Sequence, residues 1–225
     1  MAVETQHLKV ALIPGTGRMG SALARNLALA NISVFVGSRN LQKGLKTAHN
    51  LLEIYPNARI QGGTNHEAAA WADTIFWSPS GSLKEREALL QSLAPHFENK
   101  VIIDVSNVMY FFDESQWGQT SSVLLNQKAL GVPAKWTTAF KSTFYKLLEV
   151  PPNPKDPHCT FVAGDDEEAV HRTAALVEAI PGFKAVRAGG LVNSKIIELL
   201  GPRWLFELDE LNAGGKYRSG WKYVW

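Results

Sequence analysis

Three glycines at a fixed spacing are the residues with the clearest chemical meaning in this sequence. Gly15, Gly17 and Gly20 form the pattern G-x-G-x-x-G between an aliphatic run at 8–13 and an alanine- and leucine-rich segment at 21–30. The first glycine of such a pattern permits a tight turn after a strand, the second lets the backbone approach a diphosphate, and the third lets a helix pack closely on the sheet. Because the first N–H groups of a helix lack partners within it, they favour a bound anion. The segment therefore predicts the phosphate-binding turn of a dinucleotide-binding fold.

The next aliphatic run, at 32–36, ends in residues that predict which dinucleotide is bound. In such folds the end of the second strand meets the adenosine ribose, where Asp or Glu binds the 2′-hydroxyl of NAD. Here Ser38 and Arg39 occupy that place without an acid, and Lys43 follows one helical turn later. Arginine pairs a phosphate bidentately and lysine adds a point charge. The pattern favours NADP(H), the alternative being that Arg39 and Lys43 are ordinary solvent-facing charges.

Composition limits the remaining classes of function. With 225 residues and a formal net charge of +2, the chain predicts one main domain with no nucleic-acid partner. No apolar run approaches the roughly 20 residues of a membrane span, so we expect no membrane association. The single cysteine, Cys159, excludes an internal disulfide and predicts a reducing, cytoplasmic location. Cys159 falls in a predicted strand, where a buried and unreactive thiol is expected.

Alternating strand and helix patterns predict an α/β fold, a Rossmann-type doubly wound and mostly parallel sheet with a small helical C-terminal addition. We assign residues 1–188 to an NADP-binding domain and 189–225 to a C-terminal helical segment with an aromatic tail. The expected strands are 8–13, 32–36, 59–61, 73–78, 100–107, 135–140, 159–163 and 184–187. One helix is expected to follow the glycine turn and to end near residue 30. Three more are expected over 40–54, 64–71 and 83–93. The last two are expected to end near residues 179 and 211.

Three segments are harder to interpret. Poor periodicity over 108–132 predicts an aromatic loop, either a lid or substrate wall or an insertion that covers the sheet edge. Pro202 is expected to divide the helical pattern of 192–211 into two packed pieces. The aromatic tail after Gly215 is expected to cover the substrate pocket or a sister subunit.

The four acids at 165–168 are attributed to helix capping, so no metal site is predicted.

Small polar residues follow two further predicted strands. Ser78, Pro79 and Ser80 follow one strand, and Ser106 and Asn107 follow the next. Because ligands collect at the carboxyl ends of strands in open α/β sheets, these residues are candidates for contact with the rest of the dinucleotide. The alternative is that they only form turns.

Four segments together resemble a known family. They are Gly-Thr-Gly-Arg-Met-Gly at 15–20, Val-Gly-Ser-Arg at 36–39, Asp-Val-Ser-Asn at 104–107 and Ala-Gly-Asp-Asp-Glu-Glu at 163–168. This set resembles the oxidoreductases that reduce NADP with coenzyme F420, and its layout is similar to the NADPH-binding domain of the six-transmembrane metalloreductases. The resemblance implies a Rossmann-type domain, NADP(H) as cofactor and a homodimer. It also implies that Thr16, Arg18 and Met19 shape the phosphate turn, and that Ser38, Arg39 and Lys43 hold the 2′-phosphate.

The family tends to place His or Asn near the nicotinamide where this chain has the segment that ends at Lys141. We therefore expect an NADPH-dependent oxidoreductase that delivers hydride to a small organic acceptor: an imine, a ketone or a conjugated alkene. Lys141 is the candidate proton donor or polarising cation, because a partly desolvated lysine gives up its proton near neutral pH; Tyr145 is the second candidate. The alternative for Lys141 is a strand-end lysine that pairs with phosphate or solvent.

Two other functions stay open. One is a soluble oxidoreductase that links F420 or a flavin to NADP, for which no acid is needed. The other is a protein that binds or senses NADPH without catalysis.

Overall fold

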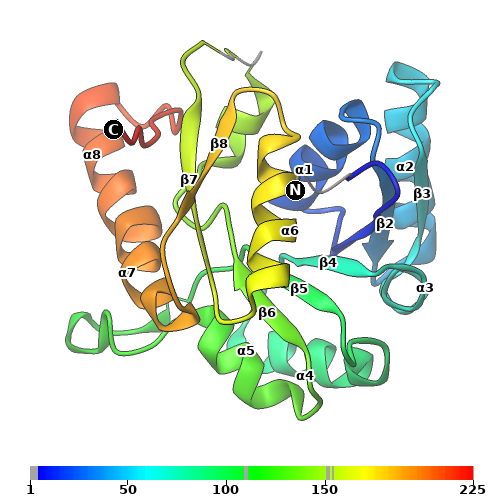
Figure 1. Cartoon of the computed structure of the whole chain (residues 1–225), viewed down its shortest axis with the longest axis horizontal. Helices are drawn as coiled ribbons and strands as arrows, with labels where there is room; N and C mark the ends of the chain where they lie inside the picture. Colours follow the sequence, from blue (N-terminus) through cyan, green and yellow to red (C-terminus); the bar gives the residue numbers. More distant parts are fainter. Residues whose placement is uncertain (1–4, 109–110, 151–152, 154, 225) are drawn as a thin grey trace.

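The computed structural model describes residues 5–108, 111–150, 153 and 155–224. Within them, eight strands form one sheet in the order β3-β2-β1-β4-β5-β6-β7-β8 (Figure 1). The strands are β1 Lys9–Ile13, β2 Ser33–Ser38, β3 Ile60–Thr64, β4 Thr74–Trp77, β5 Val101–Asp104, β6 Lys135–Thr138, β7 His158–Gly164 and β8 Phe183–Arg187. The helices are α1 Arg18–Leu29, α2 Leu41–Ile54, α3 Asn65–Trp71, α4 Leu83–Leu93, α5 Ser122–Leu130, α6 Glu167–Glu178, α7 Ser194–Glu198 and α8 Phe206–Ala213.

The strand order reverses at β1. It pairs in parallel with β2 on one side and β4 on the other, and the parallel pairing continues through β5 to β6. In doubly wound sheets the crevice for a ligand lies outside the carboxyl ends of the strands at such a switch point. Strand β7 is antiparallel to β6 and parallel to β8. The predicted class, a mostly parallel Rossmann-type sheet with a helical C-terminal addition, is confirmed.

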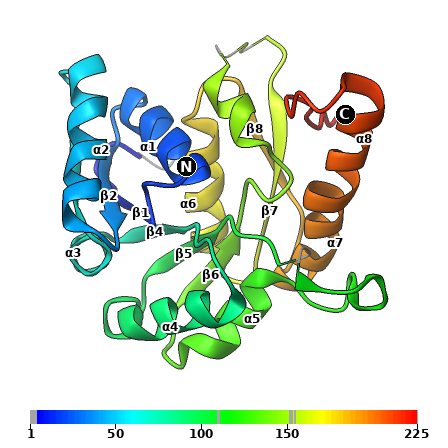
Figure 2. The ribbon, with the colours of Figure 1, turned by 180° about the vertical axis from the view of Figure 1, so that it is seen from behind.

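Helices cover both faces of the sheet and divide the core into two apolar layers. Leu23 and Leu27 of α1 pack with Val170 and Leu176 of α6 on one face. On the other face, the buried side chains of α3, α4 and α5 pack against Trp77 and its neighbours. Helices α7 and α8 lie at the β7–β8 end of the sheet, away from β3 (Figure 1, Figure 2). In the part of the chain that the structure describes, no helix combines the length and the apolar character that crossing a bilayer requires.

Local sequence explains where the helices around the crevice begin. The Asn40 side chain accepts a hydrogen bond from the backbone N–H of Lys43 and starts α2. Thr64 forms the predicted capping box with Glu67, and Ser82 forms a second one at the start of α4. Such boxes satisfy backbone donors at a helix N-terminus, so these boundaries are fixed by the chain itself.

The expectation of a loop over 108–132 is wrong in its second half. Residues 122–130 form helix α5, whose Val123 and Leu130 pack against the sheet. The apolar periodicity is hidden because Ser122 and Asn126 are also buried, at 1% and 9% exposure. Of the aromatic residues before α5, Tyr110 lies outside the described residues, and Trp117 packs with its ring 4.6 Å from the Arg203 guanidinium.

Pro202 does not divide the C-terminal helix into two packed pieces. The chain stays helical from α7 to α8 through a π-helical segment, Leu199–Leu205, which contains Pro202. A π-helical turn already lacks the i→i−4 hydrogen bonds that proline cannot make, so the ring fits there without ending the helix. A Cβ on neighbouring Gly201 would lie 2.2 Å from the carbonyl oxygen of Lys141. Glycine is therefore needed where this helix meets the loop after β6.

The aromatic tail packs on its own chain and not over the crevice. The Tyr217 ring lies 5.5 Å from that of Phe144, and the Trp221 backbone forms an antiparallel bridge with Cys159 of β7. Cys159 is buried at 4% exposure, as expected from its strand. The predicted division at residue 188 falls between β8 and the C-terminal helix, and it stays a prediction.

Candidate active site

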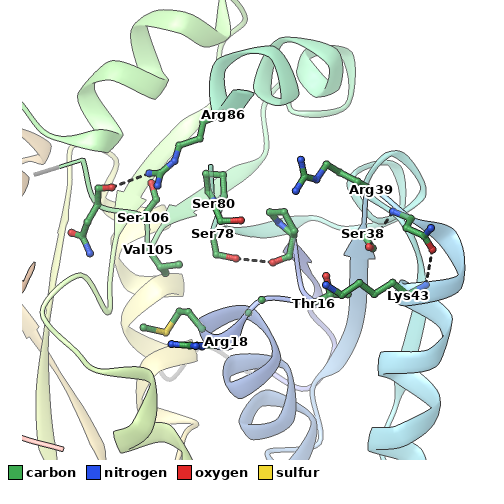
Figure 3. Close-up of a pocket in the computed structure, with 17 residues that line it drawn as sticks. Thr16, Arg18, Ser38, Arg39, Lys43, Ser78, Ser80, Arg86, Val105 and Ser106 are labelled. Carbon is green, nitrogen blue, oxygen red and sulfur yellow. Dashed lines mark hydrogen bonds between the residues drawn. The ribbon is translucent and has the colours of Figure 1, made fainter. Parts of the chain in front are cut away.

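A cleft of about 460 Å³ lies along the carboxyl ends of β1, β2, β4 and β5 (Figure 3). Its walls are the turn after β1 with the start of α1, the ends of β2, β4 and β5, Lys43 of α2 and Arg86 of α4. Four segments that are distant in sequence therefore meet at the switch point of the sheet. This is the place where a dinucleotide lies in a doubly wound fold.

The three glycines of the turn after β1 differ in what surrounds them. A Cβ on Gly15 would lie 2.9 Å from the side chains of Leu12 and Val36, and one on Gly20 would lie 2.6 Å from the carbonyl oxygen of Pro14. These two positions are closed by the protein itself. A Cβ on Gly17 would meet no atom within 4 Å, although Gly17 lines the cleft. The space beside Gly17 is thus open for a ligand that approaches the backbone at the start of α1.

The charges of the cleft have one sign. Its lining contains four cationic side chains, those of Arg18, Arg39, Lys43 and Arg86, and no acid among the described residues. Arg39 and Lys43 lie at the β2 end with Ser38, and Arg86 lies at the β5 end (Figure 3). The Ser38 hydroxyl accepts a hydrogen bond from the N–H of Asn40 at 3.2 Å, which holds this turn. A ligand that spans the cleft and carries phosphates at its middle and at one end complements this pattern.

Arg86 reaches from α4 to the end of β5. Its Nε donates to the carbonyl oxygen of Gly81 at 3.0 Å and its Nη1 to that of Asn107 at 2.8 Å. The guanidinium lies 4.9 Å from the centre of the Phe111 ring. Burial lowers the pKa of Arg86, and the carboxylates of Asp104 and Glu198 act in the opposite direction.

Asn107 presents an unpaired acceptor at the same end of the cleft. Its Nδ2 donates to the carbonyl oxygen of Lys141 at 3.3 Å. Its Oδ1 is buried and has no hydrogen-bond partner among the described residues. Since buried polar atoms are normally hydrogen-bonded, this oxygen fits an amide donor of a bound ligand.

Lys141 lies inside the protein. Its side chain is 0% exposed, with Nζ 3.1 Å from Oδ1 of Asp104 and 3.0 Å from Oε1 of Glu198, both also 0% exposed. Nζ also donates to the carbonyl oxygen of Ser106 and contacts the Ser122 hydroxyl. We call Asp104, Lys141 and Glu198 the buried charge cluster. Because acceptors of the chain surround the ammonium, its position does not fit the predicted role of a proton donor to substrate.

The buried charge cluster instead holds the backbone that forms the cleft wall. Asp104 accepts from the N–H of Ser106 at 2.7 Å, and Glu198 accepts from the N–H of Val108 at 3.1 Å. Ser106 is therefore held on both its N–H and its carbonyl. The cluster fixes the turn after β5 from behind.

Residues 9–108 match the family model "NADP oxidoreductase coenzyme F420-dependent". The chain is 32% identical to the F420-dependent NADP reductase of Methanothermobacter thermautotrophicus over 96% of its own length and 94% of the relative's. It is 29% identical to that of Methanothermobacter marburgensis over 94% and 96% of the two chains. The chain belongs to the F420-dependent NADP reductase family. Membership confirms the predicted class, an NADP(H)-dependent oxidoreductase with NADP(H) as cofactor.

A solved structure agrees in fold with this member of the F420-dependent NADP reductase family. The putative F420-dependent NADP reductase of Arthrobacter sp. FB24 superposes with a TM-score of 0.73 at 20% identity, covering 96% of this chain and 99% of its own. At this identity the likeness concerns the fold alone. The similarity extends over the C-terminal helices as well as the matched region 9–108.

The structure brings nearly all the predicted cofactor-binding residues of this family member to one cleft. All except Gly15 line it: Thr16, Gly17, Arg18, Met19, Gly20, Ser38, Arg39, Lys43, Ser78, Pro79, Ser80, Ser106 and Asn107. The prediction of their binding role stays a prediction. Tyr145 does not line the cleft; it is half-buried in the short 3₁₀ helix Tyr145–Glu149, with its ring 5.6 Å from the Arg18 guanidinium.

Sequence analysis missed four lining residues: Pro14, Asn40, Val105 and Arg86. The first three are neighbours of predicted positions and follow from the strand ends. Arg86 carries no such signal, because it belongs to a charged stretch of α4 that has the pattern of a solvent-facing helix surface. Only the fold shows that it reaches the end of β5.

Proposed function

We propose that this chain transfers hydride between NADP(H) and coenzyme F420. The observation that carries the proposal is the cleft of one charge sign at the switch point of the sheet, with cations at both ends and no acid among the described residues that line it. The names of the two Methanothermobacter relatives, which match nearly the whole chain, support F420 as the partner substrate.

The residues of the cleft fit NADP(H) by their chemistry. Arg39, Lys43 and Ser38 would hold the 2′-phosphate, and the backbone from Gly17 to Gly20 would receive the diphosphate at the start of α1. Asn107, with its unpaired Oδ1, would accept a hydrogen bond from the carboxamide of the nicotinamide. When bound, the dinucleotide supplies the hydride-carrying carbon; the protein supplies orientation and electrostatics.

The position of Lys141 favours this reaction over transfer to an imine or a ketone. Reduction of those acceptors calls for a proton beside the carbon that receives hydride, and the buried charge cluster keeps Lys141 away from the cleft. In a deazaflavin such as F420, hydride and proton enter at different ring atoms, so solvent can supply the proton. We therefore assign the cluster to positioning the turn from Ser106 to Val108.

The test combines binding with turnover. Calorimetry is expected to show tight binding of NADPH and weak binding of NADH, and addition of oxidised F420 is expected to cause NADPH oxidation with loss of F420 absorbance. NADPH oxidation by an imine, a ketone or a conjugated alkene, without reaction with F420, would overturn the choice of substrate. Absence of turnover with every acceptor would favour a binding or sensing protein instead.

We also propose a homodimer. The helical segment from α7 to α8 exposes apolar side chains: Ile196 of α7 at 59%, Trp204 of the π-helical segment at 54% and Leu211 of α8 at 77% exposure. Large exposed apolar patches mark interaction surfaces. Light scattering is expected to give twice the chain mass, and Leu211→Glu together with Ile196→Glu is expected to give monomers; monomeric wild-type protein would contradict the proposal.

A further inference from the structure

Arg86 holds a fixed positive charge at the β5 end of the cleft. Its Nε donates to the carbonyl oxygen of Gly81 and its Nη1 to that of Asn107, so the guanidinium joins the segment after β4 to the turn after β5. Both acceptors are neutral carbonyl groups and not carboxylates, so these contacts leave the positive charge uncompensated. Because an arginine side chain does not lose its proton in proteins, the charge is permanent.

The other three cationic side chains that the structure describes in the lining lie where phosphates of NADP(H) are proposed to bind. Arg39 and Lys43 lie at the β2 end, the proposed place of the 2′-phosphate, and Arg18 begins α1, which is proposed to receive the diphosphate. Figure 3 shows Arg86 on the opposite side of the cleft from Arg39. NADP(H) carries no phosphate at its nicotinamide end, which is proposed to lie there. The charge of Arg86 therefore needs another explanation.

The nicotinamide ring is the part of the cofactor whose charge changes in the reaction. The dihydronicotinamide ring of NADPH is neutral. When a hydride, one proton with two electrons, passes to a carbon of the second substrate, the ring of NADP⁺ is left with one positive charge. A fixed cation nearby raises the free energy of the oxidised ring relative to that of the reduced ring. Arg86 is half-buried, with the Phe111 ring 4.9 Å from its guanidinium, so solvent screens its charge less than that of an exposed arginine.

The buried charge cluster behind the turn after β5 has the opposite sign. It contains two carboxylates, those of Asp104 and Glu198, and one ammonium, that of Lys141. Burial lowers the pKa of Arg86 and the negative charge of these two carboxylates raises it, so the cluster and the guanidinium interact. Without Arg86, the excess negative charge of the cluster would favour the oxidised ring. The guanidinium lines the cleft and the cluster lies behind it, so the cation is the charge that faces the ligand.

We propose that Arg86 makes the cleft prefer the reduced over the oxidised form of the cofactor, through the charge of its guanidinium. This inference rests on the proposed function, because it uses the proposed position of the nicotinamide beside Asn107. A site that binds NADP⁺ less favourably than NADPH makes bound NADP⁺ the better hydride acceptor. This is the direction of the NADP reductases after which the two Methanothermobacter relatives are named.

The experiment measures the dissociation constants of NADP⁺ and NADPH by calorimetry, with no second substrate present. The quantity that matters is the constant for NADP⁺ divided by the constant for NADPH. Arg86→Gln removes the charge and is expected to lower this ratio about fivefold to tenfold, because NADP⁺ binding improves relative to NADPH binding. Arg86→Lys keeps the charge and is expected to keep a ratio within about twofold of the wild type.

Arg39→Gln is the matched control, because it removes a cation from the other end of the same cleft. It is expected to weaken NADP⁺ and NADPH binding by the same factor and to leave the ratio unchanged. Circular dichroism establishes that each variant is folded. Asn107→Asp keeps an acceptor oxygen and adds a negative charge beside Arg86, so it is expected to lower the ratio as well. This variant tests the inference if Arg86→Gln does not fold.

The outcomes separate this inference from the proposed function. A wild-type ratio in Arg86→Gln, or in Asn107→Asp if only that variant folds, overturns the inference and leaves NADP(H) binding standing. A ratio that falls as far in Arg86→Lys as in Arg86→Gln overturns it too, because the hydrogen bonds and not the charge would then matter. An equal fall in Arg39→Gln would likewise contradict a local effect. A wild type that binds neither form of the cofactor overturns both the inference and the proposed function.

Discussion

The same kind of side chain serves two purposes at one edge of the sheet. Arg39 and Lys43 lie exposed in the cleft, whose described lining contains no acid. Lys141 follows β6 nearby, yet it is completely buried and pairs with both Asp104 and Glu198. A cation that is paired with carboxylates of its own chain stabilises the fold. A cation in an acid-free cleft is available to a ligand, and this difference separates structural from functional charges here.

The largest expected effect on stability comes from removing the buried cation, Lys141. Lys141→Met leaves two buried carboxylates without a cationic partner, and we expect the free energy of unfolding to fall by about 3–5 kcal/mol. Lys135 begins β6, the strand that precedes Lys141, and pairs with Asp166 and Glu168 at the surface. Lys135→Met is expected to cost less than about 1 kcal/mol. Urea unfolding measures both, and equal losses would show that Lys141 is not the central member of a buried cluster.

The matching change in the cleft affects binding and leaves stability intact. Arg39→Ala removes a charge-assisted contact worth about 1.5–3 kcal/mol, so the dissociation constant of NADPH is expected to rise about tenfold to a hundredfold. NADH binding should not change, because it lacks the 2′-phosphate. Lys46→Ala, an exposed change on α2 outside the cleft, is the control for titration calorimetry. Equal losses for NADPH and NADH would place Arg39 elsewhere on the ligand.

Substitutions at two glycines distinguish a position that the protein's own packing closes from one that is open to a ligand. Gly20→Ala brings a Cβ within 2.6 Å of the carbonyl oxygen of Pro14, so we expect a loss of about 1–3 kcal/mol in stability. Gly17→Ala meets no protein atom within 4 Å, so its melting temperature should stay that of the wild type while NADP⁺ binding weakens. Thermal unfolding with and without NADP⁺ distinguishes the two. Wild-type NADP⁺ affinity in Gly17→Ala would mean that no ligand uses the open space.

The smallest expected effect concerns Tyr145, which touches the cleft only through Arg18. Tyr145→Leu removes a cation–π contact worth about 0.5–1 kcal/mol, so NADP⁺ affinity is expected to fall only a few-fold. Tyr145→Phe keeps the ring and should keep both affinity and kcat. A large loss of kcat in Tyr145→Phe, with unchanged binding, would restore the hydroxyl as a proton donor.

The N-terminal half of the fold was predictable because each aliphatic run ends at a glycine or a capping residue. Strand β3 was only partly anticipated, since it continues through Gly62 and Gly63 to Thr64. Those glycines are weak strand formers, but a Cβ on Gly62 would lie 2.3 Å from the carbonyl oxygen of Gly44 in α2. Close approach between helix and strand overrode local preference, as it often does.

The candidate site was less predictable where the partners of a side chain are distant in sequence. Lys141 was expected to face a substrate because the resemblance places it where the family tends to have His or Asn near the nicotinamide. Its partners Asp104 and Glu198 are 37 and 57 positions away, and neither has a motif that marks it as buried. Arg86 was missed for the opposite reason: a charged helix surface gives no sign of which residue bends toward the sheet.

Because the tail packs on β7, the single thiol, Cys159, can report on detachment of the tail. The Cys159 Sγ accepts a hydrogen bond from the backbone N–H of Tyr223 at 3.2 Å, and the N–H of Cys159 donates to the carbonyl oxygen of Trp221 at 2.8 Å. A thiol-reactive dye can reach this sulfur only after the last residues lift away. The labelling rate therefore measures how often the end of the chain detaches, and it does so with a probe that the protein already carries.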